Sequence, residues 1–186
     1  GIGLATEYGL STIPSDFYEN TTVYAGMQQQ IQYPEIPKMP ALENKIYLAL
    51  YMSDGDNVQY CQHAMSELWD KKGRGVIPIN WTISPGLVDF GPGLLNHYYT
   101  TATPNDFFAS GPSGMGYSLI YDAHNYLWNA TSGTDFTPYA KLTQQYLEKS
   151  GLRVITIWDE VNQKQMGAYA RNCRYLYGLT QQDWER

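Results

Sequence analysis

The sequence predicts an α/β fold, in which repeated strand–helix units form a mainly parallel sheet curled like a partial or irregular (β/α) barrel. Short apolar runs typical of buried parallel strands recur along the chain. Stretches with apolar residues at helical spacing follow these runs. This alternation is typical of a parallel sheet with helices packed on it. The clear strands are too few for a closed eight-stranded barrel.

The chain divides into a lead-in and one domain. Residues 1–42 show little periodicity and end in YPEIPKMPALE, which holds three prolines. Because proline fixes the backbone and removes a donor, this part is predicted to be an extended lead-in or linker from a preceding domain. Residues 43–186 form the predicted α/β domain. We expect it to continue beyond residue 186, because QQDWER ends without a helix stop.

The first strand is expected at residues 45–52, where KIYLALYM is an apolar run. The chain turns at residues 54–57 and continues as one helix, which KKGRG closes. The apolar stripe of this helix consists of Val58, Cys61, Met65, Leu68 and Trp69. A second strand is expected at residues 75–85 (GVIPINWTISP), whose internal proline indicates a bulge or an irregular start.

The middle of the chain, residues 86–136, is rich in loops. It contains a short helix around residues 94–99 and a second one after TPND, where Asp106 would cap FFAS. A strand is expected at GYSLIYD, residues 116–122.

The last part repeats the strand–helix order. Thr137-Pro138 opens a helix, with Gly151 placed as its stop. LRVITIW, residues 152–158, is the clearest strand. A further helical stripe consists of Met166, Tyr169, Ala170, Cys173 and Leu176.

Composition excludes two classes of partner. The formal net charge of −6 and the pI near 4.9 argue against a nucleic-acid footprint, which needs basic clusters, so no nucleic acid is expected to bind. No apolar run is long enough to span a membrane. Cys61 and Cys173 lack the spacing of a metal site, and they form either one long-range bridge or two unrelated thiols.

Aromatic residues are abundant, with 17 Tyr, 5 Trp and 5 Phe. Their flat apolar faces suit stacking on sugar rings, although half-buried packing explains most of them equally simply.

Polar residues follow the predicted strands at one edge of the sheet. In parallel folds the chemistry lies beyond the carboxyl ends of the strands. The residues expected to gather there are Asp54, Asp56 and Asn57, then Asn80 and Trp81, and finally Asp159 and Glu160.

Several separate segments, in order, resemble one known family. SDFYENTTVYAGM, SDGDNVQY, PINWTISPGL and TPNDFFASGPSGMGY are similar to the GxGYxYP family of putative glycoside hydrolases, in its C-terminal domain and the end of the preceding N-terminal domain. Gly114, Gly116 and Tyr117 match the naming motif, whereas Leu119-Ile120 replaces its Tyr-Pro end. The resemblance implies a carbohydrate substrate and, as partner, the N-terminal domain of the same protein. We expect an extracellular or periplasmic protein. No signal peptide is visible and the chain starts at glycine, which fits a processed protein or an excised fragment.

Asp56 is the preferred catalytic carboxylate, with Asp54 beside it. Gly55 between them would supply a backbone angle that aims both acids at one point. The alternative is that Asp54, Asp56 or Asn57 caps the following helix. A cation loop is less fitting, because Val58 and Gln59 follow where further carboxylates would be needed.

The second acid is expected to be Glu160 or Asp159. Glycoside hydrolysis needs two carboxyl groups roughly 5 to 10 Å apart, and acids at the ends of two different strands meet that distance. Helix capping explains this pair equally well.

Substrate binding is expected from Asn57, Asn80, Trp81, Gly114, Gly116 and Tyr117. Each of these residues can instead have a purely structural role. The asparagine can form a hydrogen bond that ends a strand, the glycines can form a tight loop, and the aromatic residues can pack half-buried. No cofactor and no metal are expected. A metal-dependent polysaccharide deacetylase would need an Asp and two His on one ion, and His63 lies too far into its helix. A non-catalytic carbohydrate-binding domain on a hydrolase-like scaffold is the other alternative.

Overall fold

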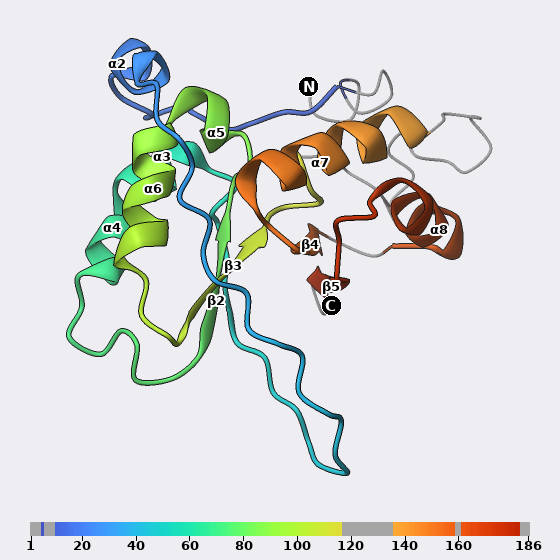
Figure 1. The fold of residues 1–186 in the computed structure, drawn as a ribbon. Helices are drawn as coiled ribbons and strands as arrows, with labels where there is room; N and C mark the ends of the chain where they lie inside the picture. Colours follow the sequence, from blue (N-terminus) through green and yellow to red (C-terminus); the bar gives the residue numbers. More distant parts are fainter. Residues whose placement is uncertain (1–4, 6–9, 117–135, 159–160, 183–186) are drawn as a thin grey trace.

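The computed structural model describes residues 5, 10–116, 136–158 and 161–182. In these residues five parallel strands form one sheet in chain order, curled into a half-barrel with helices between the strands (Figure 1). The strands are β1 (Tyr51–Met52), β2 (Ile79–Ile83), β3 (Asp106–Ser110), β4 (Val154–Trp158) and β5 (Gly178–Gln182). The predicted α/β fold with a mainly parallel sheet is confirmed.

The helices return the chain between strands. They are α2 (Thr21–Gly26), α3 (Val58–Gln62), α4 (Ala64–Trp69), α5 (Leu87–Phe90), α6 (Pro92–Thr101), α7 (Thr137–Ser150) and α8 (Gln163–Asn172). Figure 1 shows α4 and α6 beside β2 and β3, and α7 and α8 beside β4 and β5. Among the described residues, none of the helices has the length and apolar character needed to cross a membrane.

One apolar core lies between the sheet and these helices. Its buried aromatic residues include Tyr98, Tyr99, Tyr139 and Tyr169, which therefore pack in the core rather than stack on a ligand. Cys61 and Cys173 are two separate, buried free thiols.

Several predicted elements are confirmed. Helix α6 covers residues 94–99, and α7 has Pro138 in its first turn. Gly151 ends α7 in the left-handed conformation, with φ 80°. Strand β4 lies within the predicted segment, and α8 begins with a capping box between Asn162 and Gln165.

The structure corrects three other predictions. The segment after TPND is strand β3 rather than a helix, because it pairs with β2 along its whole length, from Ile79↔Asp106 to Ile83↔Ser110. The helix expected after residue 57 is broken at His63, whose φ and ψ of −118° and −88° separate α3 from α4. The strand expected at residues 45–52 contains only β1, and residues 45–50 are exposed.

Strand β5 was not predicted, since GLTQQ is short and polar. The strand expected at residues 116–122 lies, except for Gly116, outside the described residues.

Candidate functional site

The loop after β1 holds the two acids at the carboxyl end of the sheet. Asp54 is exposed and has φ 78°, a left-handed conformation that aspartate tolerates better than most residues. Asp56 is only 6% exposed. The unusual backbone angle therefore falls on Asp54 rather than on Gly55, and it leaves one carboxylate in solvent and the other buried.

Gly55 is required for a different reason, its close approach to β2. Its amide donates a hydrogen bond of 2.9 Å to Thr82 Oγ1, and that hydroxyl donates to the Met52 carbonyl at 3.0 Å. A Cβ on Gly55 would lie 1.5 Å from the Thr82 carbonyl oxygen. Only glycine fits here, so β2 fixes the position of the loop that carries both acids.

Neutral groups surround this loop. The Cys61 thiol lies 3.5 Å from the Gly55 carbonyl oxygen, and burial, together with the charge of Asp56, raises the pKa of Cys61 to about 12. Burial raises the pKa of Tyr60 to about 12, and the negative charge of Asp54 acts in the same direction. Both groups stay protonated at neutral pH.

The side chain of the N-cap residue does not cap the helix that follows the loop. Asn57 is the N-cap of α3 but makes no capping hydrogen bond, and its Oδ1 accepts from Gln59 Nε2 at 3.3 Å. The amide of Val58 donates instead to the Pro14 carbonyl at 3.2 Å. The lead-in therefore accepts a hydrogen bond from one of the free backbone amides at the start of α3.

The lead-in lies across the carboxyl ends of several strands. Besides the Pro14 contact after β1, Ile13 packs near Gly86 after β2, and Ser11 packs near Gly116 after β3. Residues 11–14 thus touch three loops of the site. Sequence reasoning missed them, since the segment has no periodicity and its contacts are all distant in sequence.

The loop after β3 is held by buried hydroxyls. The Ser113 amide donates to the Thr156 carbonyl at 2.7 Å, and the hydroxyls of Tyr139 and Tyr169 donate to the Ser113 carbonyl at 3.0 and 2.6 Å. The Tyr139 hydroxyl also lies 2.7 Å from the Gly116 carbonyl, and its single proton can be donated to either of the two carbonyls. These contacts tie the loop to β4, α7 and α8.

The glycines of this loop have separate structural reasons. Gly114 has φ 115°, and a Cβ there would lie 2.6 Å from the Thr143 side chain. A Cβ on Gly116 would lie 2.4 Å from Ser11 Oγ. Both glycines lie at the carboxyl end of the sheet, and Tyr117 lies outside the described residues.

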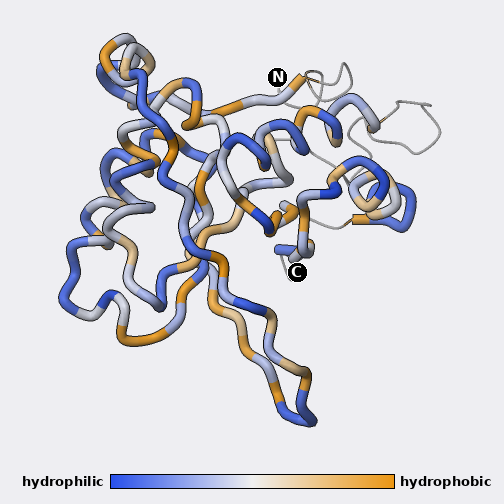
Figure 2. Tube along the Cα trace, in the orientation of Figure 1, coloured by the Kyte–Doolittle hydropathy of each residue, from blue (hydrophilic) through white to orange (hydrophobic). Residues whose placement is uncertain are grey.

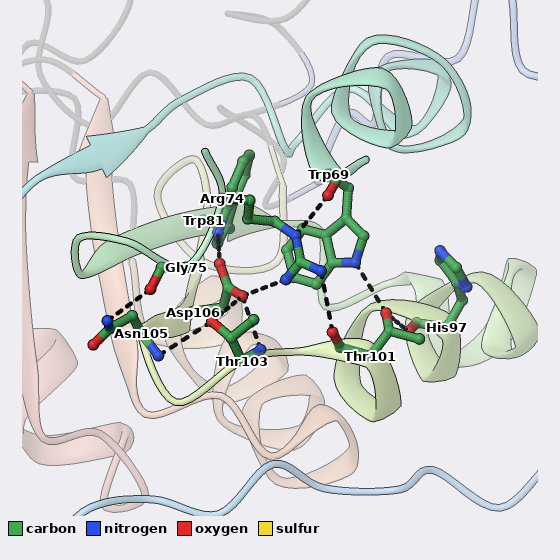
Figure 3. Close-up of polar contacts among 9 residues, drawn as sticks. All are labelled: Trp69, Arg74, Gly75, Trp81, His97, Thr101, Thr103, Asn105 and Asp106. Carbon is green, nitrogen blue, oxygen red and sulfur yellow. Dashed lines mark hydrogen bonds and ion pairs between the residues drawn. The ribbon is translucent and has the colours of Figure 1, made fainter. Parts of the chain in front are cut away.

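Asn80 and Trp81 are not at this end. They are the second and third residues of β2, because the strand begins at Ile79 rather than ending there. Asn80 Nδ2 donates to the Leu50 carbonyl at 3.0 Å. Trp81 is 2% exposed, packs 5.2 Å from the Trp69 ring, and donates its indole N–H to Asp106 Oδ1 at 2.9 Å (Figure 3). Its ring has no free face on which a sugar could stack.

Asp106 is the centre of a buried network at the amino end of the sheet. Arg74 forms an ion pair with it, and the amide and hydroxyl of Thr103 donate to its Oδ2 at 2.8 and 2.7 Å (Figure 3). Burial alone would raise the pKa of Asp106, but the hydrogen bonds from Thr103 and Trp81 and the charge of Arg74 lower it below its ordinary value. Asp106 is therefore an ion-paired residue of β3 and not a helix cap.

The second predicted acid pair, Asp159 and Glu160, lies outside the described residues. β4 ends one residue before it, and the amide of Trp158 donates to Ser113 Oγ at 3.3 Å. Within residues 10–116, 136–158 and 161–182, no three His, Cys, Asp or Glu side chains gather as a metal site. His63 and His97 are both exposed.

A protein-family model matches residues 44–183. It describes the GxGYxYP putative glycoside hydrolase C-terminal domain. The chain belongs to this family. The match covers β1 to β5, and therefore the whole GxGYxYP half-barrel with its carboxyl-end loops.

One similar solved structure is that of a putative hydrolase from Bacteroides thetaiotaomicron VPI-5482. It is 26% identical and superposes with a TM-score of 0.84. The similarity covers 100% of the present chain but 36% of that protein. The GxGYxYP chain thus spans about a third of the length of this relative. The comparison with curated proteins found no match.

Proposed function

We propose that the full-length protein hydrolyses glycosidic bonds of a poly- or oligosaccharide, with Asp56 as one catalytic carboxyl group and Glu160 or Asp159 as the other. In this chemistry one group protonates the leaving oxygen, while the other attacks the anomeric carbon or activates water. Because polysaccharides do not cross membranes unaided, the proposed place of action is extracellular or periplasmic.

The observation that carries the proposal is the placement of Asp56. It is buried at the carboxyl end of β1, on a loop that the contact between Gly55 and Thr82 holds in place. Ligand sites of parallel α/β folds lie at this end. Family membership and the name of the similar solved structure support a hydrolase that acts on sugars.

The strand order supports the pairing of acids from β1 and β4. These strands are three positions apart, about 14 Å along the sheet at a spacing of about 4.8 Å per strand. Curling of the sheet and the length of two acidic side chains shorten this separation toward the roughly 5 to 10 Å that glycoside hydrolysis requires.

The proposed substrate groove runs along the loops after β1 and β3. Gly114 and Gly116 belong to the loop after β3, but both are buried and the side chains of Thr143 and Ser11 fill the space beside them, so they shape this loop rather than touch the sugar. Asn57 at the N-cap of α3 provides an amide for a sugar hydroxyl, and Tyr117, the next residue in the sequence after Gly116, is the proposed source of a further hydroxyl. Asn80 and Trp81 are left out of this groove, because they lie near the amino end of β2.

The test is a glycan-panel screen of the full-length protein that detects released reducing ends. Turnover of at least one glycan is the expected result. Glycan-array binding without turnover by the parent protein, retained in an Asp56→Asn, Glu160→Gln double variant, would replace the proposal with a non-catalytic carbohydrate-binding domain.

A further inference from the structure

Residues 38–50 form an arm that projects from the amino end of the sheet. In Figure 1 the chain leaves the body, turns at a tip and returns to β1. Every residue of the arm is exposed. Contacts within the tip stabilise its conformation. The Glu43 amide donates to Tyr47 Oη at 2.7 Å, and Lys45 forms an ion pair of 3.3 Å with Glu43.

The arm exposes large apolar side chains. The exposed fractions are 90% for Met39, 85% for Leu42, 95% for Ile46 and 82% for Leu48. Figure 2 shows hydrophobic residues on the arm away from the core. Because large apolar side chains gain free energy when they leave water, a surface with several of them in a row is typical of an interface.

The returning half of the arm has the pattern of a buried strand. Ile46, Leu48 and Leu50 alternate along one face, and Tyr47 and Ala49 occupy the other. Strands with two apolar faces are typical of sheets covered on both sides.

This half also continues β1, which stands at the edge of the described sheet. Leu50 is its last residue before β1, and the carbonyl of Leu50 accepts from the Asn80 amide at 2.9 Å. The edge of β1 that faces away from β2 has no neighbouring strand in the described sheet. Edges of this type can pair with an added strand.

We propose that the arm docks onto the part of the full-length protein that precedes the C-terminal domain, in an apolar groove whose edge strand pairs with residues 45–50. The family match begins at residue 44, at the tip of the arm, so the arm lies where the C-terminal domain joins what comes before it. The similar Bacteroides protein is long enough to hold such a part, because the present chain covers 36% of it.

A preceding domain on the same polypeptide is a better occupant than a second copy of the chain. Two domains of one polypeptide meet at an effective concentration that can reach the order of millimolar, whereas a second copy is present only at its concentration in solution.

Hydrogen exchange tests the proposal. The amides of residues 46–50 are expected to exchange about 100-fold more slowly in the full-length protein than in the 186-residue chain, because burial of two side chains corresponds to about 3 kcal/mol. In the full-length protein, the double variant Ile46→Asp, Leu48→Asp is expected to lose this protection. The control Val23→Asp changes an exposed residue of α2, far from the arm, and is expected to retain it.

Two results would overturn the proposal. One is equal exchange at residues 46–50 in the two proteins. The other is a concentration-dependent dimer of the 186-residue chain that the double variant disperses, which would make a second copy the occupant.

Discussion

Gly55 and Thr82 are in backbone contact across β1 and β2, so close that a Cβ on Gly55 would lie 1.5 Å from the Thr82 carbonyl oxygen. Because of this contact, the position of β2 fixes the position of the loop that carries Asp54 and Asp56. Asp54 and Asp56 flank Gly55, and any displacement of the glycine displaces both carboxylates.

Gly55→Ala is expected to reduce turnover about 100-fold, because a displacement of about 1 Å is enough to misplace a catalytic group. Overpacking against backbone should also lower the free energy of unfolding by about 3 kcal/mol. Urea unfolding and initial rates on an active glycan measure the two effects. The control is Gly73→Ala, where a new Cβ meets no atom within 4 Å. Equal behaviour of the two variants would show that the contact does not constrain the loop.

Tyr139→Phe is expected to lower the free energy of unfolding by about 1 to 3 kcal/mol. The change removes the hydroxyl that lies 2.7 Å from the Gly116 carbonyl and 3.0 Å from the Ser113 carbonyl. Tyr169 still donates to the Ser113 carbonyl, whereas the buried Gly116 loses this donor. Because the same bonds hold the loop after β3, turnover should fall as well. Tyr177→Phe, at a side chain that is 69% exposed, serves as the matched control for thermal melting. A Tyr139→Phe protein that melts with the parent would contradict the assigned role.

Asp106→Asn is expected to destabilise the protein by about 3 kcal/mol at pH 7, since it leaves Arg74 without its buried partner. The folded-state pKa of Asp106 lies below its unfolded value of about 3.9, so its stabilisation is present above that pH and is lost as pH falls through the folded pKa. The difference between parent and variant should therefore shrink below about pH 4. Urea unfolding from pH 3 to pH 7 measures it, with exposed Asp16→Asn as the control. A difference that is constant with pH would exclude the ion pair as its cause.

Much of the fold could be predicted from local pattern. The segment LRVITIW and the Pro138 and Gly151 signals located β4 and α7, because apolar runs and helix-end residues act over a few positions. β3 was mistaken for a helix, since FFAS becomes a strand only through its pairing with β2. Non-local pairing outweighs local preference at such segments.

Part of the candidate site could also be located from local pattern, and part could not. The acids after β1 were located correctly, because a run of apolar residues marked the approach to the strand end. Asn80 and Trp81 were placed at the wrong end of β2, because the start of that strand was set several residues too early. The contacts of residues 11–14 join positions far apart in the sequence, and no local signal indicates them.

The most direct test of the account is turnover by an Asp56→Asn variant of the full-length protein, on the glycan that the parent cleaves best. We expect release of reducing ends to fall by at least about 1000-fold while the melting temperature stays within a few degrees of the parent, because the substitution removes the carboxyl group and keeps its shape. A folded Asp56→Asn protein that cleaves the same glycan at the parental rate would contradict the central claim.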